Sequence, residues 1–375
     1  TLLLHTYPMK DIIIVGGGIL GMLTARSLHD AGLKVMLIER GELGRESTWA
    51  GGGILSPLYP WRYPDAVSVL AKASQQQYPE LCQALLAESG VDPQYINSGS
   101  LYADDSELEA AKLWAQRYAY KLEHFTSFAA MQDCETQINT DLTRGIYLPD
   151  VAQVRNPRIA HSLRSGLRLR PMTIAEFSPV DELLIENNQA VGVRVGHSVF
   201  KAGKVIVTAG AWTGLFPAVQ LSPIKIEPVL GQMILFRAEK GLLKRIVMHQ
   251  GRYLIPRKDG RILCGSTLEY QGFQKQTTEQ AKQELREFAY DLMPALRDLP
   301  VLNHWCGLRP GSPNGIPYIG EHPEIKGLYV NAGHYRNGVV LSPASVDLLT
   351  ALLLEQTPKI NPAPYSLLAE RAPSV

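Results

Sequence analysis

Hydrophobic positions near the amino terminus form a short unbroken run, then a helical repeat, then a second run. Ile12 to Val15 are apolar and mostly β-branched, which is typical of a strand buried on both faces. From Met22 to His29 apolar residues recur at helical spacing, and Lys34 to Ile38 form the second run. The order strand, helix, strand predicts a βαβ unit with parallel strands.

The turn between the first strand and the helix has a glycine spacing that fits a dinucleotide. Gly16, Gly18 and Gly21 follow the pattern G-x-G-x-x-G. The first glycine permits the tight turn, the second lets the backbone approach a pyrophosphate, and the third lets helix and strand pack closely. Unpaired N–H groups at the start of the helix would hold the phosphates. Glu39, which follows the second strand, would accept hydrogen bonds from both ribose hydroxyls, so the sequence predicts an adenine-dinucleotide site.

The remaining pattern predicts two interleaved domains. Helices are expected at 65–90, 105–120, 156–169, 278–293 and from residue 342, and strands at 98–103, 144–148, 172–177, 183–186, 190–195, from 204 and from 327. Between residues 223 and 301 apolar and polar residues alternate, which predicts an antiparallel sheet. We expect an α/β fold: a Rossmann-like βαβ nucleotide domain (9–90, 150–222 and 303–375) interleaved with an α+β substrate domain built on that antiparallel sheet (91–149 and 223–302).

A glycine triplet and a proline-rich segment follow the βαβ unit. Gly51 to Gly53 require bare backbone, either beside a planar ring system or in a surface loop. The apolar flanks Trp49 and Ile54 favour the first interpretation. Residues 57–64 alternate prolines with aromatic side chains, which predicts an ordered, non-helical segment that serves as a lid or as a packed connection.

Charge and cysteine content narrow the class of protein. The chain has 37 Lys and Arg against 36 Asp and Glu, so no field recruits nucleic acid or anionic membrane. The four cysteines, with no C-x-x-C pair among them, argue against zinc and a disulfide framework and favour a reducing compartment: Cys82, Cys134, Cys264 and Cys306. The apolar stretch 12–25 is too short to span a bilayer. We expect a soluble, cytoplasmic protein whose natural start is Met9, preceded here by Thr1 to Pro8.

Seven motifs, spread from the first strand to the C-terminal helix, form a family signature. They are Gly16-Gly-Gly-Ile-Leu-Gly21, Glu39-Arg40, Trp49-Ala-Gly-Gly-Gly-Ile54, Ala209-Gly-Ala-Trp212, Tyr253-Leu-Ile-Pro-Arg257, Gly307-Leu-Arg-Pro-Gly311 and Gly333-His-Tyr-Arg-Asn-Gly338. On these residues the chain resembles the D-amino-acid oxidase family of flavoenzymes, and looks most like its glycine oxidase branch, which is associated with thiamine biosynthesis. The resemblance implies one FAD and no metal. Some relatives attach the flavin through a cysteine, but Cys306 does not match that position well, so noncovalent FAD is expected.

The resemblance also assigns site residues. Arg309 would bind the substrate carboxylate with a two-donor fork, Tyr253 would give a hydroxyl to the same carboxylate, and Arg336 would lie near the substrate amine. Arg309 could instead pair with a surface acid, and Tyr253 could be an ordinary strand aromatic. The implied cofactor-binding residues are Gly16, Gly18, Ile19, Leu20, Gly21, Glu39, Arg40, Ser47, Thr48, Gly51, Gly52, Gly53, Ile174, Gly210, Gly333, His334, Tyr335, Asn337, Gly338, Val339 and Val340. We expect His334 to be a hydrogen-bonding spacer and not a base.

The implied reaction is oxidative deamination of glycine or another small amino acid, such as sarcosine or a small D-amino acid. Hydride transfer from the α-carbon to flavin N5 would give an imino acid, which water hydrolyses to a keto acid and ammonia, while dioxygen is reduced to hydrogen peroxide. The partners would be that substrate and dioxygen, and whether the chain forms a homo-oligomer is left open.

Three alternatives stay open at this point. The first is a D-amino-acid or sarcosine-type dehydrogenase that passes electrons to a quinone or other carrier. The second is a flavin-binding protein without turnover, and the third is the oxidase half of an enzyme that modifies a glycine attached to a macromolecule. The balanced charge disfavours the third.

Overall fold

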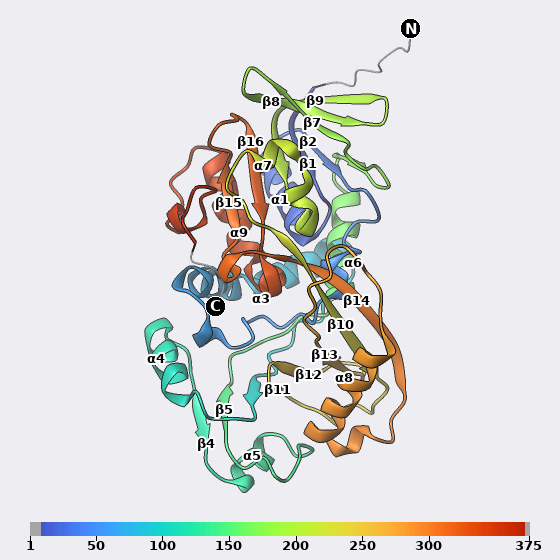
Figure 1. The fold of residues 1–375 in the computed structure, drawn as a ribbon, viewed down its shortest axis with the longest axis vertical. Helices are drawn as coiled ribbons and strands as arrows, with labels where there is room; N and C mark the ends of the chain where they lie inside the picture. The colour runs from blue at the N-terminus through green and yellow to red at the C-terminus, as the bar shows by residue number, and fades with distance from the viewer. Residues whose placement is uncertain (1–8, 372–375) are drawn as a thin grey trace.

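Two sheets of eight strands each organise the chain (Figure 1). The computed structural model describes residues 9–371, so the expectation about Thr1 to Pro8 lies outside the described residues. The first sheet contains β1 (Lys10–Val15), β2 (Val35–Ile38), β6 (Thr173–Ala175), β7 (Glu182–Glu186), β8 (Gln189–Val195), β9 (Ser198–Val207), β15 (Tyr318–Glu321) and β16 (Leu328–Ala332). The second contains β3 (Ser100–Tyr102), β4 (Glu123–Phe125), β5 (Gly145–Leu148), β10 (Glu227–Phe236), β11 (Ile246–His249), β12 (Arg252–Pro256), β13 (Ile262–Gly265) and β14 (Val301–Gly311). The predicted α/β class is confirmed.

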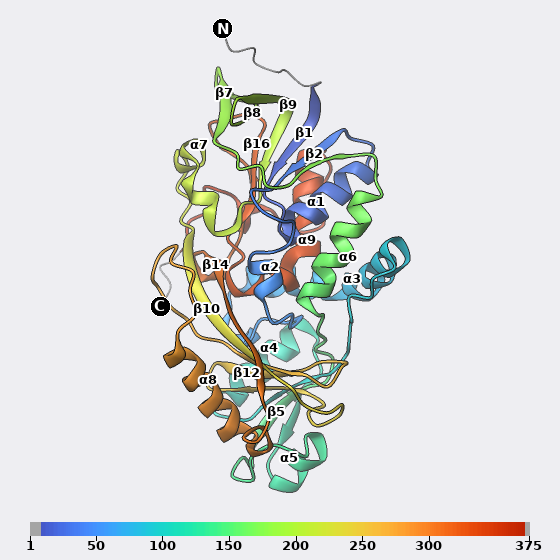
Figure 2. The same cartoon turned by 90° about the vertical axis from the view of Figure 1, so that its right-hand side faces the viewer.

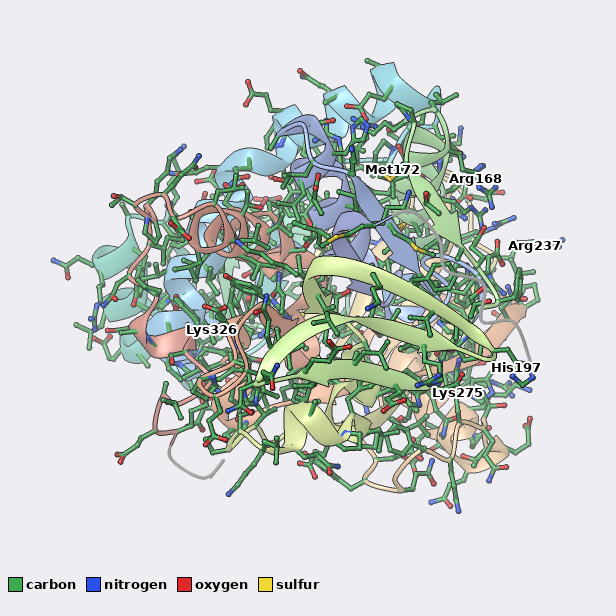
Figure 3. The ribbon with its side chains drawn as sticks, turned by 90° about the horizontal axis from the view of Figure 1, so that it is seen from above. Arg168, Met172, His197, Arg237, Lys275 and Lys326 are labelled. Carbon is green, nitrogen blue, oxygen red and sulfur yellow. The ribbon has the colours of Figure 1, made fainter. Side chains whose placement is uncertain are left out.

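Helices cover one face of the first sheet and a β-layer covers the other. The helices of the described residues are α1 (Ile19–Asp30), α2 (Ser47–Ala50), α3 (Asp65–Ser89), α4 (Leu108–Tyr118), α5 (Phe128–Cys134), α6 (Asn156–Arg168), α7 (Pro217–Gln220), α8 (Glu279–Leu292) and α9 (Gly338–Leu353). Ile12 and Ile14 of β1 point into a core shared with α1, α3, α6 and α9. Ile13 and Val15 point to the opposite face, where β7, β8 and β9 pack. Figure 3 looks down on that layer, with His197 at the turn between β8 and β9.

The βαβ unit forms as predicted, and two of its glycines lie where a side chain would overlap the backbone. β1 lies between β2 and β9, parallel to both, in the order β15-β16-β9-β1-β2-β6. Gly16 has a φ of +111°, and a Cβ there would overlap the carbonyl of Thr208. A Cβ on Gly21 would overlap the carbonyl of Gly16 where α1 packs on β1. The parallel order brings the carboxyl ends of β1, β9 and β16 to one edge of the sheet.

The second sheet has the order β14-β10-β13-β12-β11-β3-β5-β4, and α8 packs on it. It departs from the predicted domains at one place. Residues 303–311 were expected in the nucleotide domain, yet they belong to β14, which pairs antiparallel with β10 from Glu227–Gly311 to Phe236–Val301 (Figure 2). The physical reason is the length of both strands, which form one continuous ribbon. We therefore propose that the substrate domain extends to Gly311.

Helix α9 begins at Gly338, earlier than the expected residue 342. Pro343 lies inside it and cannot donate a hydrogen bond to the carbonyl of Val339. That carbonyl instead accepts hydrogen bonds from the hydroxyl of Tyr78 on α3 and from Ser342 Oγ, at 2.9 Å for the serine. The helix therefore continues through the proline because its orphaned carbonyl is satisfied by side chains.

The proline-rich segment 57–64 is a packed connection. Tyr59 and Trp61 stack edge-on and both contact Tyr102 of β3, with ring centroids 5.4 and 4.8 Å from it. Trp61 also meets Trp114 of α4. Across residues 9–371 no helix is both long enough and apolar enough to cross a lipid bilayer.

Candidate active site

A cavity of about 400 Å³ runs from the carboxyl edge of the first sheet to β12 and β14 of the second. Twenty of the predicted site residues line it: Gly16, Gly18, Ile19, Leu20, Glu39, Arg40, Ser47, Thr48, Gly51, Gly52, Gly53, Gly210, Tyr253, Arg309, His334, Tyr335, Arg336, Gly338, Val339 and Val340. Four predicted residues are not among those that line it: Gly21, Ile174, Gly333 and Asn337. Gly21 instead packs α1 on β1, and Asn337 precedes α9. The structure thus brings residues from all seven sequence motifs to one cavity, and the motif at 253–257 contributes Tyr253.

Glu39 forms one end of the cavity. Its two carboxylate oxygens accept the backbone N–H groups of Gly17 at 2.6 Å and Gly41 at 2.9 Å, which fixes the side chain in place. A carboxylate offers about four acceptor positions, so two remain for ribose hydroxyls. Arg40 follows, with its guanidinium 3.5 Å from the ring centroid of Trp212.

The start of α1 and the start of α2 meet beside the glycine turn. Thr48 Oγ1 accepts the N–H of Ile19 at 2.9 Å, which satisfies one of the donors that a helix start leaves unpaired. Gly18 precedes α1 in extended conformation. The turn therefore presents bare backbone and the positive end of a twelve-residue helix to the cavity, an arrangement that suits phosphate.

The glycine triplet is required by protein contacts as well as by the cavity. Gly53 has a φ of +78°, and a Cβ there would overlap the carbonyl of Val154. A Cβ on Gly52 would meet the ring and hydroxyl of Tyr253 at 3.3 Å. The Gly52 carbonyl also accepts a hydrogen bond from Arg257 at 2.7 Å. The surface-loop interpretation is wrong, and close approach to neighbouring parts of the chain explains the glycines before any ligand is considered.

Arg309, at the far end, has no acidic partner within residues 9–371. Its Nη1 donates to the carbonyls of Leu230 at 3.2 Å and Thr267 at 3.3 Å, and its Nη2 donates to Ser266 Oγ at 2.7 Å. Three of five N–H donors are thereby used, and two remain for a ligand. Removal from bulk water, together with the nearby charge of Arg336, lowers the pKa of Arg309. A desolvated cation without a counterion favours an anionic ligand.

Tyr253 and Arg336 lie with Arg309 in the wall of the same cavity. Tyr253 is buried on β12, and within residues 9–371 its hydroxyl has no hydrogen-bond partner. The guanidinium of Arg336 donates to the carbonyl of Gly251 at 3.4 Å. Neighbouring Tyr335 has a raised pKa, mainly because of burial, so it stays a neutral hydroxyl. This end therefore combines two cations with neutral hydroxyl donors.

His334 is not built to act as a base at neutral pH. Burial lowers its pKa to about 3, and its Nε2 lies 3.0 Å from Ser345 Oγ on α9. A neutral imidazole held by a serine is consistent with a hydrogen-bonding spacer, which stays a prediction.

Several residues that line the cavity escaped sequence reasoning. Val180 lines it where Ile174 was expected, because Ile174 pairs with Leu37 inside the sheet. Ser266 and Asn331 also line it, from the end of β13 and from β16. Asn331 carried a usable signal, since a polar residue interrupts the apolar run of β16 just before the glycine turn.

The fold and the site define a dinucleotide-dependent enzyme. The profile of the family described as FAD dependent oxidoreductase matches residues 11–352, and the chain belongs to this family. FAD is its cofactor, and the fixed Glu39 carboxylate and bare glycine turn fit the ribose and pyrophosphate of that molecule.

Named relatives are similar over nearly the whole chain. A glycine oxidase of Pseudomonas aeruginosa is 46% identical over 365 residues, which cover 95% of this chain and 98% of that protein. The crystal structure of glycine oxidase from Geobacillus kaustophilus superposes with a TM-score of 0.91 at 25% identity, covering 98% of this chain and 100% of that one. A bifunctional ThiO/ThiG protein of Trichormus variabilis is 29% identical over 92% of this chain and 53% of its own length. These findings confirm the resemblance to the glycine oxidase branch.

Proposed function

We propose that this enzyme oxidises glycine and other small amino acids, with sarcosine and small D-amino acids as the nearest alternatives. The amino-acid class is supported by the cation-lined end of the cavity, and glycine by the names of the relatives at 44–46% identity. The name of the ThiO/ThiG relative supports a role in thiamine biosynthesis.

The observation that carries the proposal is the guanidinium of Arg309. It faces the cavity, three neutral acceptors hold it in place, and it lacks a counterion within residues 9–371. A carboxylate with two oxygens matches the two N–H donors that remain. Tyr253 would add a hydroxyl to the same carboxylate, and the backbone or side chain of Arg336 would contact the amine.

The remaining residues orient the substrate and need no proton-accepting side chain. Bound FAD supplies the oxidising chemistry by accepting a hydride. The low pKa of His334 leaves it neutral, so the amine must bind in its neutral form or lose its proton to water. The start of α9, whose residues Gly338 to Val340 line the cavity, would place a positive helix end beside bound FAD and would favour negative charge there.

We further propose that FAD is held noncovalently, that dioxygen is the electron acceptor, and that the enzyme works in the cytoplasm. Cys306 is not among the residues that line the cavity, and burial raises its pKa, so its thiol is a poor nucleophile. All four cysteines are free thiols, as suits a reducing compartment. The alternative acceptor is a quinone or another carrier.

The test uses the purified holoenzyme with glycine, sarcosine, D-alanine and ethylamine. It measures oxygen uptake with an oxygen electrode, together with hydrogen peroxide formation. We expect oxygen uptake with the amino acids and little with ethylamine, which lacks the carboxylate. Flavin reduction without oxygen uptake would establish the dehydrogenase alternative. Normal turnover of ethylamine would contradict the role of Arg309, and flavin that stays with acid-precipitated protein would contradict noncovalent binding.

A further inference from the structure

Asn331 is a buried amide that nothing in the described chain satisfies. Its side chain is 1% exposed, it lines the cavity from β16, and neither its Oδ1 nor its Nδ2 has a hydrogen-bond partner within residues 9–371. Leaving a buried polar group unpaired is destabilising, and an amide has both a donor and an acceptor to satisfy. A polar group in this state beside a ligand cavity indicates a contact that the ligand completes.

The strand order shows which part of the cofactor passes this position. Along the sheet edge, β2 leads to Glu39 and the ribose, and β1 leads to the glycine turn and the pyrophosphate. The next strands in space are β9 and then β16, the strand that carries Asn331. The substrate end, with Arg309, lies beyond them on the second sheet. An extended FAD laid along this edge therefore places the chain between its pyrophosphate and its flavin ring at β9 and β16.

The side chain also points to the appropriate face. Residues two apart on a strand share a face, and Tyr329 packs into the core with α1 and α9. Asn331 therefore lies on the helix side of the sheet, where the starts of those two helices line the cavity through Ile19 and Val340. This location is between the two helix ends, at the position of the linking chain.

We propose that the amide of Asn331 binds the ribityl chain of FAD. The chemistry matches, because each ribityl hydroxyl is both a donor and an acceptor, as the amide is. A phosphate offers acceptors alone and would leave the carbonyl oxygen of the amide unpaired. The proposal concerns the cofactor and not the amino acid, so it stands whether or not glycine is the substrate.

The first test compares Asn331→Leu with Val330→Ala, using holoenzyme. Leucine keeps the volume but removes both polar atoms, and we expect FAD to dissociate about tenfold more readily on dilution, measured by flavin fluorescence. The midpoint temperature of Asn331→Leu should need about tenfold more FAD than that of wild type for the same rise above its ligand-free value. Val330 packs on the opposite face, so its variant should show a deficit that added FAD does not close. Asn331→Ala carries the same expectation if leucine proves too wide.

The second test uses FAD analogues that each lack one ribityl hydroxyl. For the wild type, one analogue should bind about tenfold more weakly than FAD, and Asn331→Leu should bind that analogue and FAD equally. Unchanged FAD retention in Asn331→Leu, a temperature deficit that added FAD does not close, or equal losses for wild type and variant with every analogue would overturn the proposal. All readings are taken without substrate, so a failure of amino-acid oxidation would not be mistaken for a failure here.

Discussion

The two ends of the cavity are lined by different kinds of groups, backbone at one end and long side chains at the other. The cofactor end consists mainly of backbone, where Gly16, Gly18 and a carboxylate pinned by two N–H groups are already satisfied within the protein. The substrate end consists of long side chains, and Arg309 lacks a counterion within residues 9–371. A preorganised backbone keeps its shape without ligand, whereas an unpaired charge is stabilised only when ligand arrives. The residues that bind substrate should therefore lower the stability of the ligand-free protein, whereas the glycine turn should not.

The largest expected effect tests that cost directly. Arg309→Ala should lower kcat/KM over a hundredfold, which corresponds to a loss of more than about 3 kcal/mol of transition-state stabilisation. Arg309→Lys should lower it roughly thirtyfold, or about 2 kcal/mol, because lysine lacks the planar fork. The midpoint temperature of FAD-loaded, substrate-free Arg309→Ala should not fall, because an unpaired charge has been removed. Steady-state kinetics and thermal unfolding give both readings.

Arg257 provides the matched control for Arg309. It is also a buried arginine held by three neutral acceptors, Gln153 Oε1 at 2.9 Å, the Val154 carbonyl at 3.2 Å and the Gly52 carbonyl at 2.7 Å, but it is not among the residues that line the cavity. Arg257→Met should therefore lower the midpoint temperature. A stability loss in Arg309→Ala as large as that in Arg257→Met would show that the two ends do not differ in the way described.

His334 lies between the two ends and should make stability depend on acid. Its pKa falls from 6.5 in the unfolded chain to about 3 in the folded one, so the unfolded state binds the extra proton between these values. Stability from this group is thus complete above pH 6.5 and declines as pH falls toward 3, by about 4 kcal/mol. His334→Gln, which can still bond to Ser345, should flatten that decline in urea unfolding measured at several pH values. An unchanged acid slope would contradict the neutral, buried state of His334.

Glu39 tests the cofactor end. Glu39→Gln keeps the shape but loses the charge and one acceptor, so we expect FAD to bind about thirtyfold more weakly, or about 2 kcal/mol. At saturating FAD, kcat should stay within about twofold of wild type, because Glu39 lies at the far end from Arg309. Flavin fluorescence titration measures the first quantity and oxygen uptake the second. Equal FAD affinity in both proteins would remove Glu39 from the ribose site.

Ser266 should give the smallest effect. Its hydroxyl positions the Arg309 guanidinium at 2.7 Å, one of three such contacts. Ser266→Ala should raise KM and the dissociation constant of acetate about fivefold, about 1 kcal/mol, with kcat unchanged. Acetate binding can be followed through its effect on the flavin spectrum. A change in kcat at constant KM would assign Ser266 a role other than holding the carboxylate-binding arginine.

The sequence predicted the glycine turn and Glu39 at the cofactor end more readily than the other residues that line the cavity there. The βαβ unit and Glu39 lie within one short stretch whose turn geometry follows from local steric limits. Ile174 was placed in the cavity only by the family resemblance. The chain instead turns at Phe177, with φ of 53°, is held by the Ser178 N–H bonded to the Glu39 carbonyl, and brings Val180 to the cavity.

Long-range pairing set a second limit. The motif around Arg309 could be recognised, but nothing local shows that Val301–Gly311 pairs with β10 and not with the nucleotide sheet. The helix start at Gly338 was also missed, because Pro343 predicts a later start unless one knows that Tyr78, on a distant helix, bonds to the Val339 carbonyl. Each of these features depends on a partner far away in the chain.

The ribbon of β10 and β14 has a consequence for the timing of turnover. Pairing along the whole length of both strands makes this ribbon a stiff part of the second sheet, which cannot bend there without breaking ladder bonds. The short loop 266–278 is the easier part to move: Tyr270 in it is 65% exposed, and Lys275 reaches Glu46 at 2.7 Å. Loops of this size move in nanoseconds to microseconds, and lobe closure takes microseconds to milliseconds. We expect substrate exchange to be limited by the loop motion, in nanoseconds to microseconds, and not by lobe closure.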